Sequence, residues 1–385
     1  MNRPQALVLP LLAALLAPSA APAQTADSTR IPLTIPGRTP VADTLAAGDR
    51  ALHFYQRARA FEAAGKRAAA LSAYRNCVLA DPAFPDAYYR LGMLFIAFGD
   101  VEEARQCFDA ELRNTPDHEQ AGRELGLVLA RLGRAEEGLP MLETYRDAHP
   151  DEGLAWYALG FAYMRVGRAE DAEMALERSI AIGPPNPVWH RDLGAVYAAR
   201  GDLEGARREY ATALRMDPQN PTPLVNLGNL ELRGGRHEQA LEAYRAAEAI
   251  DSTLHVALNG QVQVLRELGR RDEAAAVYRR WLSKRPGDHG ARLEAVHFFQ
   301  SIEQPGQAVA IAREGVATSD RSAEARMVLA IALEGAGHRD EAVHELERAR
   351  ELYRLPAERE RAQQLIDRLR GDADPDSLAP GANTP

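Results

Sequence analysis

A 34-residue period dominates this sequence. The stretch LGMLFIAFGDVEEA begins at Leu91, and the closely similar LGAVYAARGDLEGA begins at Leu193, which is 102 residues or three periods later. Nine consecutive 34-residue repeats account for residues 51–356 without an insertion. Self-similarity at a fixed period of this length predicts an array, in which one small structural motif is copied along the chain. The repeats begin at Ala51, Pro85, Glu119, Gly153, Pro187, Pro221, His255, His289 and Ala323.

Each repeat carries the pattern of two helices. Positions 4, 7, 8 and 11, counted from the start of a repeat, have the spacing of one helix face, and positions 20, 24 and 27 continue on a second helix. Glycine fills position 15 in eight of the nine repeats, which is typical of a residue that ends a helix in the left-handed conformation. Repeat 8 departs most from the pattern, since Ala295 and Val296 replace Leu-Gly and Glu303 replaces the turn glycine.

The repeats resemble those of the tetratricopeptide repeat (TPR) family. The period and the W-x-x-L-G-x-x-Y … A-x-x-x-F … P skeleton match that family's signature. Repeat 4 shows the skeleton as Trp156, Leu159, Gly160, Tyr163, Ala172, Leu176 and Pro184. The resemblance implies an all-α fold, an α-solenoid superhelix of about nine helix-turn-helix repeats. A single hairpin cannot bury its apolar face alone, so the repeats are expected to stack on their neighbours.

The N-terminus has the features of an export signal. Arg3 precedes an apolar run from Ala6 to Ala17, and Ala21-Pro22-Ala23 fits an A-x-A cleavage site. We expect a signal peptide over residues 1–23, cleavage after Ala23, and an exported protein, periplasmic or secreted, without direct membrane insertion after cleavage. An uncleaved N-terminal anchor is the alternative interpretation.

The segments that flank the repeats differ from them in composition. Residues 24–44 are expected to be a flexible linker, residues 45–356 the repeat array, and residues 371–385 a disordered tail. Residues 357–370 are expected to form a capping helix that covers the open face of the last repeat. Its apolar stripe consists of Ala362, Leu365, Ile366 and Leu369.

Charge and motifs exclude several function classes. The formal net charge of −9 and the sequence pI near 5.7 disfavour a nucleic-acid-binding protein, which usually presents a basic face. The sequence contains no G-x-S-x-G, Walker, G-x-G-x-x-G or H-E-x-x-H motif. Asp372, Asp374 and Asp376 are not followed by the glycine and glutamate of a calcium loop. We therefore expect neither an enzyme nor a cofactor or metal site.

Two cysteines remain to be placed. Cys77 and Cys107 lie on the predicted second helices of adjacent repeats. An oxidising compartment would permit a disulfide between them, whereas two small buried apolar side chains are the alternative.

The resemblance to the TPR family implies a partner-binding groove. In that family the first helices line a concave surface, and positions 2, 5, 6, 9, 12 and 13 commonly face the ligand. Tyrosine and arginine anchor many protein interfaces, and asparagine can pair with a peptide amide through both its donor and its acceptor. The residues implied to contact a protein or peptide are Tyr89, Arg123, Arg131, Tyr157, Arg165, Arg191, Asn226, Asn229, Arg233 and Asn259.

The sequence thus predicts a non-catalytic scaffold that mediates protein–protein interactions in the bacterial cell envelope. A chaperone-like holder of unfolded or extended segments, or an accessory subunit of a secretion, pilus or polysaccharide-export system, is the alternative function.

Overall fold

The computed structural model describes residues 46–371, and within that range the chain is all-helical. Its helices form pairs that follow the 34-residue period, with one further helix after the ninth pair. The predicted fold class, an all-α array of helix-turn-helix repeats with a capping helix, is confirmed. The expected signal peptide, linker and tail lie outside the described residues, apart from Gly371 at the end of the last helix.

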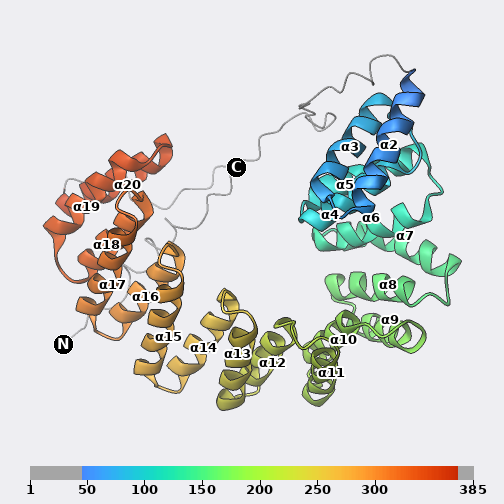
Figure 1. Ribbon diagram of the computed structural model, residues 1–385. Helices are drawn as coiled ribbons and strands as arrows, with labels where there is room; N and C mark the ends of the chain where they lie inside the picture. The colour runs from blue at the N-terminus through green and yellow to red at the C-terminus, as the bar shows by residue number, and fades with distance from the viewer. Residues whose placement is uncertain (1–45, 372–385) are drawn as a thin grey trace, which may run out of the picture. The chain divides into compact units, whose positions relative to one another are not determined.

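The nine hairpins are labelled in Figure 1. The first helices of the repeats are α2 (Ala47–Ala63), α4 (Ala87–Phe98), α6 (Glu119–Arg131), α8 (Gly153–Val166), α10 (Pro187–Arg200), α12 (Thr222–Arg233), α14 (His255–Glu267), α16 (His289–Ser301) and α18 (Ala323–Gly335). The second helices are α3 (Arg67–Ala80), α5 (Val101–Asn114), α7 (Ala135–Ala148), α9 (Ala169–Ile182), α11 (Leu203–Met216), α13 (His237–Ile250), α15 (Arg271–Lys284), α17 (Pro305–Thr318) and α19 (Arg339–Leu352). The capping helix is α20 (Pro356–Arg370).

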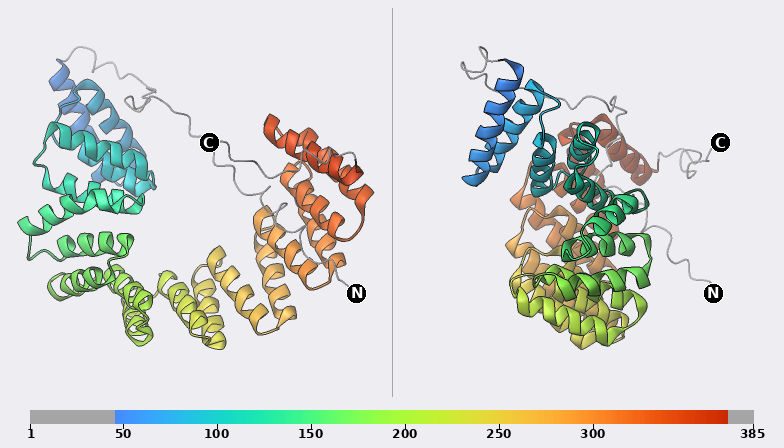
Figure 2. Two further views of the ribbon diagram at one scale, coloured as in Figure 1. Left: turned by 180° about the vertical axis from the view of Figure 1, so that it is seen from behind. Right: turned by 90° about the vertical axis from the view of Figure 1, so that its right-hand side faces the viewer.

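The chain divides into two compact units, an N-terminal unit that ends at Leu230 and a C-terminal unit that begins at Glu231. The boundary falls inside α12, in repeat 6. Within each unit the two helices of a hairpin contact each other, and the second helix of most hairpins contacts the first helix of the next. Figure 2 shows this succession of hairpins from two further directions. Because α20 packs on α19 and buries Leu365, Ile366 and Leu369, the last hairpin has its apolar face covered.

Glycine at position 8 sets the spacing between the two helices of a hairpin. A Cβ atom on Gly126 would lie 2.6 Å from the side chain of Leu142 at position 24 and 3.1 Å from the carbonyl oxygen of Gly138. The same contact recurs in repeat 2, where a Cβ on Gly92 would lie 2.7 Å from the ring of Phe108. Any side chain at these positions would have to push the two helices apart, so the glycines allow the close approach.

The turn inside each hairpin requires a left-handed residue at position 15. Eight glycines occupy this position with φ between 69° and 86°, from Gly65 to Gly337. Repeat 8 keeps the same turn without glycine, since Glu303 has φ 61°. Residues with a Cβ rarely adopt this conformation, because it brings the Cβ close to a backbone carbonyl oxygen.

The substitution Glu303→Gly is therefore expected to stabilise the C-terminal unit by about 0.5 to 1 kcal/mol. The relief of about 1–2 kcal/mol of left-handed strain exceeds the larger conformational entropy that glycine gives to the unfolded chain. Denaturant unfolding of the variant measures the change. The reverse substitution in the next repeat, Gly337→Glu, is the matched control and should destabilise; a loss of stability in Glu303→Gly would contradict the strain argument.

Candidate partner-binding surface

Three first helices of the N-terminal unit, α6, α8 and α10, lie side by side. Helix α6 contacts α8, and α8 contacts α10, in addition to the contacts that each makes with its own second helix. Side chains on these helices that do not point into a hairpin are therefore brought next to one another across repeats. We call the side of α4, α6, α8 and α10 that carries positions 5, 9, 12 and 13 the first-helix face.

Half-buried apolar side chains occupy positions 9 and 12 of this face in α4 and α8. Met93 and Ile96 of α4 pack at the edge of the core of repeats 1 to 3, and Phe161 and Met164 of α8 pack at the edge of the next core cluster. Part of each side chain is exposed. Surfaces that combine aromatic residues and methionine are adaptable binding surfaces, because methionine changes shape at low energetic cost.

Two exposed arginines lie at the C-terminal ends of α6 and α8. The Nε of Arg165 donates a hydrogen bond of 3.2 Å to the carbonyl oxygen of Ala130, the residue before Arg131. Both arginines are exposed, and within residues 46–371 neither forms an ion pair with a carboxylate. The arginines that open the second helices of the same repeats differ, because Arg134 pairs with Glu137 and Arg168 with Asp171, each at 2.7 Å.

Tyr157 and Arg191 are held by a buried carboxylate. The hydroxyl of Tyr157 donates to Asp192 over 3.0 Å, and its ring stacks on Trp189 with the centroids 5.7 Å apart. Arg191 pairs with the same carboxylate at 2.7 Å. Burial raises the pKa of Asp192, although the charge of Arg191 opposes the shift. Burial also raises the pKa of Tyr157, reinforced by Asp192 and opposed by the charges of Arg191 and Arg131.

The structure corrects the expected accessibility of Arg123. Its side chain is only 8% exposed, and its guanidinium donates to the hydroxyl of Tyr145 at 2.9 Å and to Glu124 at 2.6 Å. Position 5 is an outward position in the repeat pattern, but these two acceptors draw the arginine into the interior of the hairpin. Arg123 therefore stabilises repeat 3 and is not presented to a ligand.

The remaining implied residues are divided between the two units. Tyr89 is half-buried, with its ring 4.9 Å from the ring of His118. Asn226 is half-buried and Asn229 is exposed, both on the part of α12 that belongs to the N-terminal unit. Arg233 is exposed and Asn259 is half-buried in the C-terminal unit, where the Asn259 amide lies 3.2 Å from the ring of His255.

Both cysteines are buried free thiols in this structure. Burial raises the pKa of Cys77 and of Cys107 to about 12 in each case. A protonated thiol is a poor nucleophile, so the described structure agrees with two small apolar side chains and contains no bridge between them.

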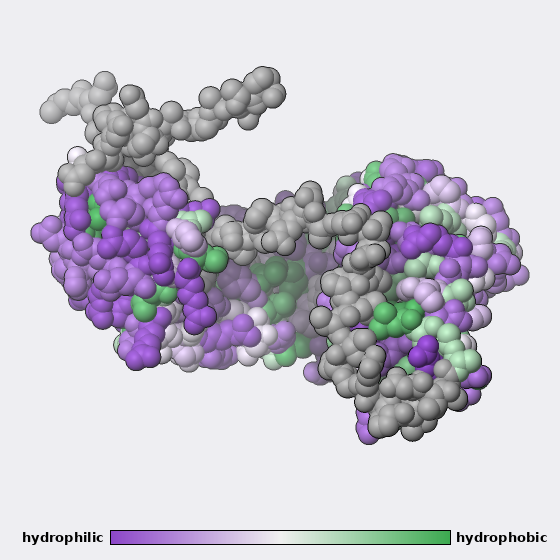
Figure 3. All heavy atoms as spheres, turned by 90° about the horizontal axis from the view of Figure 1, so that it is seen from above, coloured by the Kyte–Doolittle hydropathy of each residue, from purple (hydrophilic) through white to green (hydrophobic). Residues whose placement is uncertain are grey.

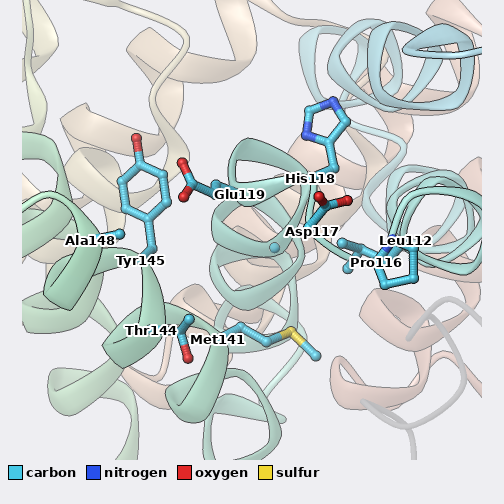
Figure 4. Close-up of a pocket in the computed structure, with 10 residues that line it drawn as sticks. Leu112, Pro116, Asp117, His118, Glu119, Met141, Thr144, Tyr145 and Ala148 are labelled. Atoms are coloured by element: carbon cyan, nitrogen blue, oxygen red, sulfur yellow. The ribbon is translucent and has the colours of Figure 1, made fainter.

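A cavity in repeat 3 was missed from the sequence. It has a volume of about 340 Å³ and lies among α5, α6 and α7. In Figure 4, Glu119, His118 and Asp117 lie along the upper side of the cavity, with Pro116 and Leu112 beside Asp117, while Met141 and Thr144 lie below. The signal that could have revealed it is Gly122 at position 4, where most repeats carry a large side chain.

Neither a metal centre nor a membrane-spanning helix is found among the described residues. Residues 46–371 contain no group of three or more histidine, cysteine, aspartate or glutamate side chains placed to hold a metal ion. Within the same residues, no helix combines the length and the apolar character needed to cross a membrane. The surface seen in Figure 3 is mostly hydrophilic, with hydrophobic residues in small groups.

Comparison with models of known protein families identifies the repeat. A tetratricopeptide repeat family model matches residues 55–119, 123–187 and 191–254, and a second model of the same repeat matches residues 257–289. Among curated proteins, a search finds no significant match.

Among solved structures, the chain is similar to MamA (41-end) from Desulfovibrio magneticus RS-1, with 24% identity over 45% of this chain and 98% of that one and a TM-score of 0.40. It is similar to PilF of Pseudomonas aeruginosa, with 17% identity over 54% and 94% of the two chains and a TM-score of 0.43. A chain of the APC/C hetero-tetramer Cut9–Hcn1 matches 83% of this chain over 76% of its own, with 14% identity and a TM-score of 0.42.

Proposed function

The chain belongs to the tetratricopeptide repeat family, whose fold is a scaffold for protein–protein interaction, and from this premise we propose that its first-helix face binds an extended polypeptide that carries carboxylate groups. The N-terminal unit supplies the whole of this surface, from α4 to α10.

The observation that carries the proposal is the pair formed by Arg131 and Arg165. Two exposed guanidinium groups on adjacent helices, neither paired with a carboxylate of the described chain, form a local positive site on a chain with a net charge of −9. Guanidinium groups bind carboxylates through two parallel hydrogen bonds, which gives both affinity and orientation. The half-buried side chains of Phe161 and Met164, on the same helix as Arg165, offer apolar contacts to the rest of the segment.

We further propose that the protein is exported and acts without catalysis in the bacterial cell envelope. The support is the sequence of residues 1–23 with its cleavage site after Ala23 and the scaffold nature of the fold. A chaperone-like holder of unfolded segments is the second candidate function, favoured by Met93 and Met164 on the first-helix face. Such a holder binds many segments weakly, whereas an assembly scaffold binds one partner at fixed stoichiometry.

The test compares two double variants with the same change in charge. Arg131→Glu with Arg165→Glu reverses the unpaired site, while Arg134→Glu with Arg168→Glu reverses the paired arginines of the same repeats. A photo-crosslinking amino acid at the exposed position Ala97, on α4, reports capture by the full chain in envelope fractions of the native host. We expect the first double variant to lose at least about tenfold in captured partner, which corresponds to about 1.4 kcal/mol of binding free energy, and the second to retain it.

Equal losses in both double variants would show that only net charge matters and would remove the proposed site. One dominant crosslinked protein at constant ratio supports the scaffold, while a broad distribution of captured proteins supports the holder. The mass of the purified chain shows whether it begins at Gln24.

A further inference from the structure

The cavity of repeat 3 exists because one side chain is missing. Gly122, on the first turn of α6, lines the cavity, and a Cβ atom built on it would meet no atom within 4 Å. Gly122 occupies position 4 of its repeat, the position of the tryptophan in the family pattern. At about 340 Å³, the cavity lies at the small end of the range of about 300–1,000 Å³ that is usual for ligand sites.

Three other repeats of this chain place a large donor side chain at the equivalent position. Position 4 is Trp156 in repeat 4, Arg292 in repeat 8 and Arg326 in repeat 9. Each of these side chains donates a hydrogen bond to the carbonyl oxygen of the residue six positions earlier. The bonds are Trp156 Nε1 to Pro150 at 2.8 Å, Arg292 Nη2 to Pro286 at 2.6 Å, and Arg326 Nη2 to Asp320 at 2.7 Å.

Repeat 3 keeps the acceptor but lacks the donor. The residue six positions before Gly122 is Pro116, which lines the cavity. Within residues 46–371, no hydrogen bond reaches the carbonyl oxygen of Pro116. In the three repeats above, an internal side chain uses this space and this acceptor. In repeat 3 both are therefore free to take a side chain from another polypeptide.

The charges around the cavity indicate whether it suits the indole of a tryptophan or the guanidinium of an arginine. Asp117 and Glu119, both exposed, place carboxylates at its rim (Figure 4). Glu119 lies 2.9 Å from His149, and His118 lies 3.3 Å from Asp86, so the histidines at this end already have acidic neighbours. In repeat 9 the buried Arg326 also reaches a carboxylate, that of Glu345 at 2.8 Å. A negative rim favours a guanidinium over the neutral indole of tryptophan.

We propose that the cavity of repeat 3 receives an arginine side chain from a partner polypeptide. The arginine stem lies against Leu112 and Met141, and its guanidinium binds the carbonyl oxygen of Pro116 and the carboxylate of Asp117. The inserted side chain takes the place that Arg292 and Arg326 hold in their own repeats. The cavity lining includes neither Arg131 nor Arg165, and it recognises a basic residue where the first-helix face recognises an acidic segment.

The test uses a short peptide as a probe and a methionine methyl group as the reporter. The full chain is labelled with ¹³C at its methionine methyl groups, and the signal of Met141 is followed during titration with acetyl-Gly-Arg-Gly-amide. We expect a saturable shift of the Met141 signal. The same peptide with citrulline, which is neutral and nearly the same shape, should bind at least about tenfold more weakly.

Variants of the chain separate the cavity from its surroundings. Gly122→Arg supplies the missing side chain from within and should abolish the shift, whereas Gly122→Ala adds one methyl group to open space and should leave binding intact. Asp117→Asn, at an exposed position, should weaken binding several-fold and keeps the test valid if Gly122→Arg does not fold. The Arg131→Glu/Arg165→Glu variant should bind the probe normally, so failure of one site is distinguishable from failure of the other.

Three results would overturn the proposal. Equal binding of the citrulline peptide would show that charge is not recognised. Tighter binding of a tryptophan peptide would assign the cavity to an aromatic side chain. A shift of the Met141 signal in an Arg30→Ala/Arg38→Ala variant without any probe would show that the N-terminal segment of this chain occupies the cavity in place of a partner.

Discussion

Replacing Arg292 by alanine is expected to destabilise the C-terminal unit by about 3 kcal/mol. Truncating a large buried side chain leaves a cavity that costs about 2–5 kcal/mol, and the carbonyl oxygen of Pro286 loses a charged donor, which costs about 1–3 kcal/mol. Part of this loss of stability is offset, because the variant no longer keeps a charged guanidinium away from water. Arg292 is 1% exposed, and burial lowers the pKa of its guanidinium, so the charge is held at a cost.

The environment of Arg292 explains why the repeat tolerates it. Its Nη1 donates to the carbonyl oxygen of Ile311 at 2.7 Å, and its Nη2 donates to Pro286 at 2.6 Å. Gly315 on α17 makes room, since a Cβ there would lie 2.5 Å from the arginine side chain. The guanidinium thus links α16 to α17 and to the turn before α16, in the repeat whose Leu-Gly pair and turn glycine are both replaced.

Amide hydrogen exchange of α16 and α17, together with denaturant unfolding, measures this effect. Protection should fall first in these two helices, because each repeat of such an array contacts only its neighbours. Arg292→Lys keeps the charge and most of the stem and should cost less. Arg313→Ala, on α17 with a side chain 59% exposed, is the control and should cost less than about 1 kcal/mol. A cost below about 1 kcal/mol for Arg292→Ala would mean that the apolar core alone holds repeat 8 together.

The substitution Gly126→Val is expected to destabilise the N-terminal unit by about 3 kcal/mol, at the upper end of the range for overpacked cores. The new Cβ would lie 2.6 Å from Leu142, which is fully buried, and 3.1 Å from the backbone oxygen of Gly138. Leu142 is enclosed on all sides, and the second contact is with a backbone oxygen, which no side-chain rotation can relieve. The two helices of repeat 3 must therefore separate, which also disturbs the contact of α6 with α8.

A glycine one turn earlier on the same helix provides the control. Gly122→Ala places its methyl group in open space and should stabilise the unit by about 0.5–1 kcal/mol, because alanine has the higher helix propensity. Denaturant unfolding of the two variants should thus give changes of opposite sign. Similar effects from both would show that helix propensity, and not the spacing of α6 and α7, governs glycines in this hairpin.

The sequence predicted the fold well because its determinants are local and repeated. Apolar spacing within one helix, glycine at the turn and small residues at positions 8 and 20 all act within about 34 residues, and nine copies average out the exceptions. Even Glu303, which breaks the turn pattern, adopts the left-handed conformation that its position requires. The packed helices on either side of this turn fix the backbone conformation there.

The candidate site was predicted less well because side-chain exposure depends on partners that are distant in sequence. Arg123 and Arg131 were equivalent candidates, yet Tyr145, 22 residues after Arg123, accepts its hydrogen bond and helps to bury it. Arg131 has no such acceptor and stays exposed. The cavity at Gly122 likewise depends on how α5, α6 and α7 meet, and the glycine alone does not show whether Tyr145 fills the space.

The sequence by itself determined that this chain is an array of helical hairpins of the tetratricopeptide repeat family, since hydrophobic period and turn residues are encoded along the chain. Only the tertiary structure decided which side chains a partner can reach. Burial and hydrogen bonding are properties of packed neighbours: Arg123 and Arg292 hold hairpins together, Arg131 and Arg165 remain on the surface, and the space beside Gly122 stays open.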